Sequence, residues 1–250
     1  MDAFLHTFFD WDEILAVLPL LLTEGIRNTL VIAVLAALLG LVVGMVLAMM
    51  LLSRHRLLRL PARIYVDVFR GLPAIATISL IGLGLPAAGL RPFGRSPIGY
   101  AVLAVGLISA AYCAEVFRSG IRSVDPGQMQ AGRSLGMSYL QTMRKVIVPQ
   151  GVRNVLPALT NRFIVDIKES SLVYLLGLTT GERELYFIAQ QQQATTFNSS
   201  ALVAASACYL LMTVPLTYLV NAWDRHLRDG RPVSGPRAAK VVPAQELSEV

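Results

Sequence analysis

A long uncharged segment near the start of the chain is the feature that most limits how it can fold. No residue between Arg27 and Arg54 is charged, and the stretch from Thr29 to Leu52 is almost wholly apolar. A helix needs roughly 20 mostly apolar residues to cross the hydrocarbon core of a bilayer. The sequence therefore predicts a membrane-spanning helix over about 28–52.

The composition of the whole chain agrees with a membrane protein. Hydrophobic residues make up 54% of the 250 residues and charged residues only 15%, whereas soluble proteins carry about 25% charged residues. These figures exclude a disordered chain, a disulfide scaffold and an ordinary cytosolic enzyme, and they leave no room for a separate soluble domain. The net charge of +6 fits basic cytoplasmic loops rather than nucleic-acid binding.

Four further segments are apolar enough to be considered as spans. They cover about 62–85, 97–117, 155–177 and 200–223. The first and third of these contain Pro, Gly or charged residues, which membrane helices tolerate where neighbouring helices satisfy the backbone. We therefore predict an all-α membrane protein with five transmembrane helices. Gly40 and Gly44 form a GxxxG pattern, which either brings two helices close together or is incidental.

The distribution of basic residues predicts the orientation of these spans. Fifteen of the 22 Lys and Arg residues lie in segments 53–63, 118–153 and 224–250, and four lie in the alternate connections. Basic loops face the cytoplasm, so we expect a cytoplasmic C-terminus and an extracytoplasmic N-terminus.

The predicted domain organisation follows from these spans. A transmembrane domain covers 25–223, and a charged tail covers 224–250 and is predicted to be disordered beyond Arg228. The N-terminal segment, 1–24, is predicted to be extracytoplasmic, and within it Phe4 to Leu22 forms either an interfacial helix lying flat on the membrane or an irregular leader. Its acidic start does not resemble a cleaved signal peptide.

Residues that commonly form disulfides or metal sites are few and scattered. Cys113 and Cys208 both lie in apolar runs, so we expect buried free thiols. His6, His55 and His226 are far apart in the sequence, and no Ser/His/Asp or Cys/His pair occurs in a catalytic context. We expect no metal ion, no cofactor and no catalytic residue.

The polar segment between the third and fourth spans predicts two short helices. Asp125 before Pro126 is a good N-cap for a helix ending near Leu135, and Gly136 suits a helix C-terminus. A capping box formed by Ser138 and Gln141 then begins a second helix that should run to about Val148 and end at Pro149.

Two small residues distinguish the first of these helices. Ala131 and Gly132 leave one of its sides nearly bare, which lets another surface approach the backbone closely. That surface belongs either to a cytoplasmic partner or to this chain itself, and the residues alone leave both interpretations open.

The fourth span contains charged residues, which are costly at membrane depth and therefore functional candidates. At about 100° per residue, Arg162, Asp166 and Glu169 share one face and Lys168 points away from it. This stripe either pairs internally or gates a path, with Arg70 and Glu115 as further members, or it contacts a cationic group of a substrate.

The polar loop resembles the EAA loop of ABC-importer membrane subunits. That pattern is Glu-Ala-Ala, three residues, Gly, nine residues, and Ile-x-Leu-Pro, and this chain keeps both gaps. It carries Gln130-Ala131-Gly132, then Gly136, then Val146-Ile147-Val148-Pro149, and therefore departs at Gln130, Gly132, Val146 and Val148. The loss of the acid at Gln130 removes any salt bridge made there.

Flanking phrases extend the resemblance to the polar amino-acid uptake branch over about residues 24–225. They read TLVIAVLAALLGLVVGM, YVDVFRGLP, VFRSGIRSVDPGQ and KESSL. The resemblance implies a type I importer permease in the bacterial inner membrane, with a polar amino acid as substrate. It also implies a second permease subunit, identical or not, two copies of an ATP-binding subunit and an extracytoplasmic solute-binding protein, besides membrane lipid.

The resemblance also assigns an ATPase-coupling role within the loop. The residues concerned are Gln130, Ala131, Gly132, Gly136, Val146, Val148 and Pro149. The chain has no GxxxxGK[ST] phosphate loop, so ATP hydrolysis is expected in a separate subunit and this chain is expected not to be an enzyme.

Two other functions are compatible with a membrane protein of this size. An ion-gradient-driven secondary transporter predicts inverted repeats with interrupted helices, which five spans and one long loop fit poorly. A non-transporting membrane scaffold would use the loop to bind some other protein. Co-purification of an ATP-binding subunit distinguishes the importer from both alternatives.

Overall fold

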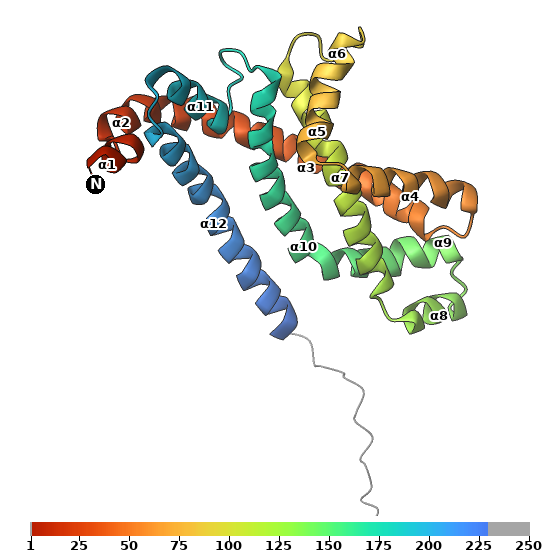
Figure 1. The fold of residues 1–250 in the computed structure, drawn as a ribbon. Coiled ribbons are helices and arrows are strands. Elements are labelled where there is room, and N and C mark those ends of the chain that lie inside the picture. The colour runs from red at the N-terminus through yellow and green to blue at the C-terminus, as the bar shows by residue number, and fades with distance from the viewer. Residues whose placement is uncertain (1, 230–250) are drawn as a thin grey trace, which may run out of the picture.

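The computed structural model describes residues 2–229 as an all-helical chain (Figure 1). The helices are α1 (Asp2–Phe8), α2 (Trp11–Leu20), α3 (Ile26–Leu52), α4 (Arg56–Gly71), α5 (Ala74–Ser79), α6 (Leu85–Ala87), α7 (Pro97–Arg122), α8 (Pro126–Ser134), α9 (Tyr139–Thr142), α10 (Val148–Glu169), α11 (Leu185–Thr196) and α12 (Ser200–Asp229). Wider π turns occupy Leu21–Gly25, Leu80–Gly84 and Met143–Ile147, and a 3₁₀ helix occupies Ser170–Leu176.

Three helical runs in the described part are long and apolar enough to cross a membrane. They are Phe4–Leu52, Pro97–Arg122 and Ser200–Ala222, and they correspond to the segments predicted over 28–52, 97–117 and 200–223. The segment predicted over 155–177 is also helical, but it is too polar to pass the same test. Length and composition therefore support three spans, or four if the bent pair described next is one span.

The segment predicted as a continuous span over 62–85 is broken. Helix α4 and the helical run Ala74–Ala87 meet at 108°. The break falls where Leu72 adopts an extended conformation (φ −80°, ψ 142°) directly before Pro73. Proline disfavours helical geometry in the residue before it and has no N–H to donate, so the chain turns sharply here.

The structure decides between the two alternatives for the N-terminal segment and extends the last helix past the predicted start of the tail. Residues 2–20 form α1 and α2, so the irregular leader is wrong and a helical segment is present. This segment is tied to the start of α12, since Asn198 donates to the His6 carbonyl at 2.9 Å. Helix α12 continues to Asp229, beyond the predicted tail boundary, and the rest of the predicted tail lies outside the described residues.

The two glycines of the GxxxG pattern lie where α3 packs against α7. A Cβ atom added at Gly40 would lie 2.6 Å from the Ser109 hydroxyl oxygen, and one at Gly44 would lie 2.7 Å from the Cys113 Cβ. Because lipid provides no hydrophobic drive between helices, such close backbone approach is what holds them together. Cys113 itself is buried and free, as predicted, and so is Cys208.

Hydrogen bonds and an ion pair join the π turn before α3 to the loop before α11. The Glu24 carboxylate accepts hydrogen bonds from the Arg183 side chain at 3.1 and 2.8 Å and from the Gly181 N–H at 2.8 Å. In the same loop, Glu184 caps α11 by accepting from the backbone N–H groups of residues 186 and 187. Burial raises the pKa of the Glu184 carboxyl to about 7.

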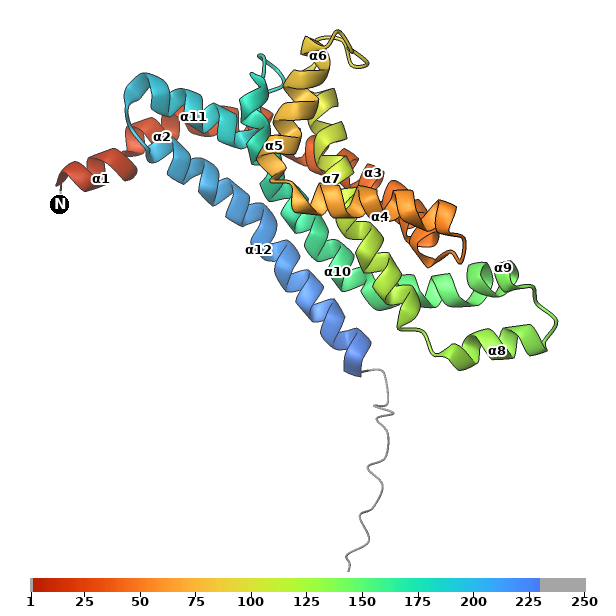
Figure 2. The same ribbon diagram turned by 45° about the vertical axis from the view of Figure 1, so that its right-hand side comes forward.

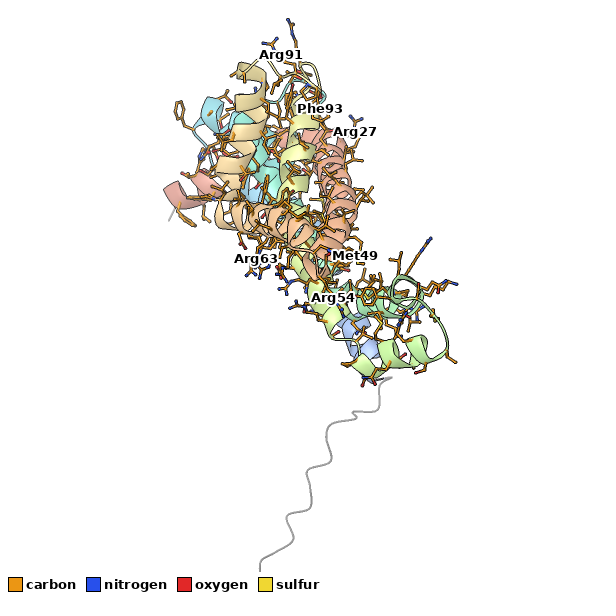
Figure 3. The ribbon with its side chains drawn as sticks, turned by 90° about the vertical axis from the view of Figure 1, so that its right-hand side faces the viewer. Arg27, Met49, Arg54, Arg63, Arg91 and Phe93 are labelled. Carbon is orange, nitrogen blue, oxygen red and sulfur yellow. The ribbon has the colours of Figure 1, made fainter. Side chains whose placement is uncertain are left out.

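The helix pair α8 and α9 projects from one end of the molecule, and the C-terminal end of α12 lies at that same end (Figure 2). Figure 3 shows Arg54 and Arg63 toward this end, whereas Arg91 and Phe93 lie at the opposite end. The described basic segments 53–63 and 118–153 therefore lie toward the same side.

The close contact between α3 and α7 predicts a large difference between two glycine substitutions. Gly44→Val forces α7 away from α3 and is expected to lower the free energy of unfolding by about 1–3 kcal/mol. Gly71→Ala adds a methyl group where no atom lies within 4 Å and should change stability by less than about 0.5 kcal/mol. Thermal unfolding in detergent measures both, and equal melting temperatures would contradict this packing.

Candidate functional site

The charged residues of α10 form one buried cluster. The Arg162 guanidinium donates to the Asp166 Oδ1 atom from Nε at 2.9 Å and from Nη2 at 2.6 Å, and it also pairs with Glu169. Arg162 is 8% exposed and Asp166 is fully buried. Lys168 is exposed. The shared face predicted from helical spacing is therefore confirmed, including the exclusion of Lys168.

Helix α7 contributes a residue that sequence reasoning missed. The Ser109 hydroxyl donates to the second oxygen of Asp166 at 2.9 Å. Ser109 is also the residue that packs against Gly40. A small hydroxyl in an otherwise apolar span was the available signal, but it acquires meaning only once α3, α7 and α10 are brought together.

An aromatic ring connects the cluster to α4. The guanidinium carbon of Arg162 lies 4.7 Å from the Tyr112 ring centroid, and that of Arg70 lies 5.4 Å from it. Both contacts are within the range of cation–π attraction. Arg70 thus reaches the cluster through Tyr112, whereas Glu115 pairs with Arg118, so its suggested membership is wrong.

A large apolar groove runs along the cluster between α3, α7 and α10. It encloses about 870 Å³, and its walls include Leu38, Met45 and Phe163. Ser109, Arg162 and Asp166 also line it. The side chains of Arg162 and Asp166 and the hydroxyls of Ser109 and Thr160 are the polar groups beside an otherwise apolar space, where charges interact more strongly than in bulk water.

The polar loop folds largely as its capping residues predicted. The Asp125 side chain accepts from the Gly127 N–H at 2.6 Å at the start of α8. Gly136 follows the end of α8 with φ of +81°, a conformation that glycine adopts without strain. Ser138 and Gln141 form the reciprocal capping box of α9.

Pro149 does not end the second helix, contrary to prediction. The chain passes from α9 through the π turn Met143–Ile147 into α10 without a break. In this turn the Val148 N–H bonds to the Met143 carbonyl, five residues back. The wider turn shifts the carbonyls that a proline ring would otherwise meet, and Pro149, near the N-terminus of α10, loses only one hydrogen bond.

The small side chains of α8 face different surroundings. A Cβ atom at Gly132 would lie 2.6 Å from the Thr142 Cγ2 atom, so α9 of this chain covers Gly132. Ala131 and Gln130 are exposed. Interpretation of Gly132 as part of a bare docking surface is therefore wrong, and the accessible surface includes Gln130 and Ala131 together with the 83% exposed Leu135.

A small apolar core attaches this loop to the bundle. Ile121 and Val124 pack against Met143 and Ile147. The partly buried residues that pack against this core include Val146 and Val148, and Pro149 is exposed. The loop is thus anchored at its base and open along α8.

Two ion pairs with the same i,i+4 spacing, one buried on α10 and one exposed on α4, are expected to contribute differently to stability. Asp166→Ala leaves the buried Arg162 with a single acidic partner and should cost about 3–5 kcal/mol of stability. Asp67→Ala breaks a pair with Arg63 whose side chains are 72% and 69% exposed and should cost less than about 1 kcal/mol. Unfolding in detergent gives both values, and a smaller loss for Asp166→Ala would argue against a buried pair.

Comparisons with known proteins agree with this architecture. Residues 40–229 match the family described as "Binding-protein-dependent transport system inner membrane component". The chain is 34% identical to an arginine transport system permease protein of Bacillus subtilis over 88% of this chain and 97% of that protein. It is 32% identical to a putative glutamine transport system permease protein of Rickettsia bellii over 83% of this chain and 93% of that protein.

A solved structure shares the fold. The crystal structure of an amino acid ABC transporter with histidines contains a chain that superposes with a TM-score of 0.76 at 34% identity, covering 87% of this chain and 98% of that one. The chain therefore belongs to the family of inner-membrane components of binding-protein-dependent transport systems.

Proposed function

We propose that this chain is a permease subunit that forms the translocation path for a polar amino acid in an ATP-driven importer. The similarity to an arginine transport permease over 88% of the chain carries this proposal. ATP is hydrolysed by a separate ATP-binding subunit, present in two copies. An extracytoplasmic solute-binding protein delivers the substrate, and a second permease subunit completes the path.

The proposed topology has five crossings, with the N-terminus outside and the C-terminus in the cytoplasm. Composition supports one of these crossings only if the bent pair of α4 and Ala74–Ala87 counts as one span, and it does not support the crossing by the charged helix α10. Internal pairing supports the crossing by α10, since Arg162 faces two acids instead of lipid. Charged groups persist at membrane depth when they pair within the protein.

Helix α8 is the proposed coupling element. It is exposed along Gln130 and Ala131, and the apolar side chains of Leu135 and Leu140 are 83% and 70% exposed beside it. We assign these exposed apolar side chains to the surface that contacts the ATP-binding subunit. Gly132, Gly136, Val146, Val148 and Pro149 shape and anchor the loop, so that closure of the ATPase is transmitted into α10.

The charged cluster is proposed to gate the path, with Glu169 as its most accessible acid. The Glu169 side chain is 19% exposed, whereas those of Arg162 and Asp166 are 8% and 1% exposed. Glu169 is therefore the acid best placed to exchange its contact with Arg162 for the cationic group of a substrate.

The coupling proposal predicts the effects of two matched substitutions. Ala131→Glu places a bulky charge on the exposed side of α8 and should weaken binding of the ATP-binding subunit at least tenfold, about 1.4 kcal/mol. Ala194→Glu makes the same change on the exposed part of α11 and should leave binding intact. Co-purification from detergent tests this, and undiminished recovery of the ATPase with Ala131→Glu would contradict the coupling role.

The gating proposal predicts a second contrast on α10. Glu169→Ala is expected to reduce ATP-dependent amino-acid uptake into proteoliposomes at least tenfold, because the pair with Arg162 is lost. Lys168→Ala should transport nearly as well as the unmodified protein, because Lys168 lies outside the cluster. Equal uptake by the two variants would count against a role for this face.

A further inference from the structure

A second cavity, distinct from the apolar groove, lies between α4 and the C-terminal end of α7, which the proposed topology places in the cytoplasm. It encloses about 320 Å³, and its polar lining consists of Arg59, Arg63, Asp67, Glu115, Arg118 and Arg122. These six residues are here named the arginine pocket. The pocket belongs neither to the charged cluster of α10 nor to the coupling helix α8.

The charges in the arginine pocket do not cancel. Four guanidinium groups face two carboxylates. Arg118 pairs with Glu115, and Arg63 approaches Asp67 at 3.8 Å. Within residues 2–229, Arg59 and Arg122 have no carboxylate partner. The pocket therefore carries an excess positive charge and two guanidinium groups with free donors, a combination suited to a phosphate group.

Helix α4 presents three adjacent stripes of side chains, which are buried, basic and exposed apolar. The third stripe indicates that the ligand also has an apolar part. At about 100° per residue, Ala62 and Val66 share the buried face, and Arg59 and Arg63 follow beside it. A third stripe next to the basic one is apolar and exposed. It comprises Leu57, Leu60, Ile64 and Val68, which are 90%, 61%, 55% and 46% exposed.

The order of these stripes matches the structure of a phospholipid. A ligand whose charged group binds in the arginine pocket could lay a hydrocarbon chain along the adjacent apolar stripe of α4. Free phosphate would satisfy the guanidinium groups but leave this strip uncovered, and an acidic peptide would not match its apolar character. Basic pockets between helices at the cytoplasmic side are suited to anionic lipid headgroups.

We propose that the arginine pocket binds the phosphate of an anionic phospholipid of the cytoplasmic leaflet, with an acyl chain along the exposed apolar stripe of α4. Arg59 and Arg122 hold the phosphate, and the carboxylates of Asp67 and Glu115 orient Arg63 and Arg118. This lipid fixes α4 against α7 at the membrane surface. The proposal extends beyond transport and does not depend on the identity of the amino acid.

Binding of defined lipids to the full-length protein tests this assignment. Delipidated protein is placed in nanodiscs of phosphatidylcholine with or without phosphatidylglycerol. We measure the melting temperature of the protein, and native mass spectrometry identifies the lipid that stays bound. Phosphatidylglycerol should raise the melting temperature and remain bound, and pure phosphatidylcholine should do neither. If inorganic phosphate alone stabilises the protein as well, the site takes a small anion and the lipid assignment is overturned.

A pair of double variants locates the effect. Arg59→Gln with Arg122→Gln should weaken retention of phosphatidylglycerol at least tenfold. Arg54→Gln with Arg56→Gln removes the same charge from residues that are outside the pocket but nearby and should retain the lipid. Equal retention of phosphatidylglycerol by the two double variants overturns the proposal. The proposal is also overturned if the pocket variant loses a partner subunit to the same extent with and without this lipid. The lipid comparison on the unmodified protein decides the matter even if a variant fails to fold.

Discussion

The contact between α3 and α7 is the constraint on which the rest of this structure depends. Gly40 and Gly44 lack side chains where α7 passes, so Ser109 and Cys113 approach the α3 backbone directly. In a membrane this closeness replaces the hydrophobic drive that packs soluble proteins. It also determines where Ser109 points, and therefore which group can complete the hydrogen bonding of Asp166 on α10. One small-residue contact thus positions a charged cluster on a third helix.

The charged cluster shows how ionisable groups are accommodated beside an apolar groove. Asp166 receives hydrogen bonds from Arg162 and Ser109, and Arg162 also contacts Glu169 and the face of Tyr112. Arg162, Asp166 and Glu169 each have a partner, because an unpaired buried charge would be too costly. The break between α4 and α5 matters here as well, since Arg70 lies beside the break and makes the second cation–π contact with the Tyr112 ring.

The two small residues of α8, Ala131 and Gly132, have different surroundings. Gly132 lets α9 pack closely on α8, and Ala131 stays on the exposed side. This internal packing holds α9 against α8, and the core around Ile121 and Ile147 joins the pair to α7 and α10. The coupling role proposed for α8 depends on this packing, because a partner that moves α8 would then also move α10.

Local pattern alone determined much of this protein. The apolar runs predicted the helices over 28–52, 97–117 and 200–223, and helical spacing placed Arg162, Asp166 and Glu169 on one face. The capping residues predicted where the two helices of the loop begin. Each of these depends on residues close together in the sequence. Tertiary structure alone decided the partner of Gly132, the contribution of Ser109, the position of Tyr112 between two arginines and the passage of the chain through Pro149. The reason is physical: these features depend on which distant backbone or side chain fills a given space, and no local periodicity contains that information.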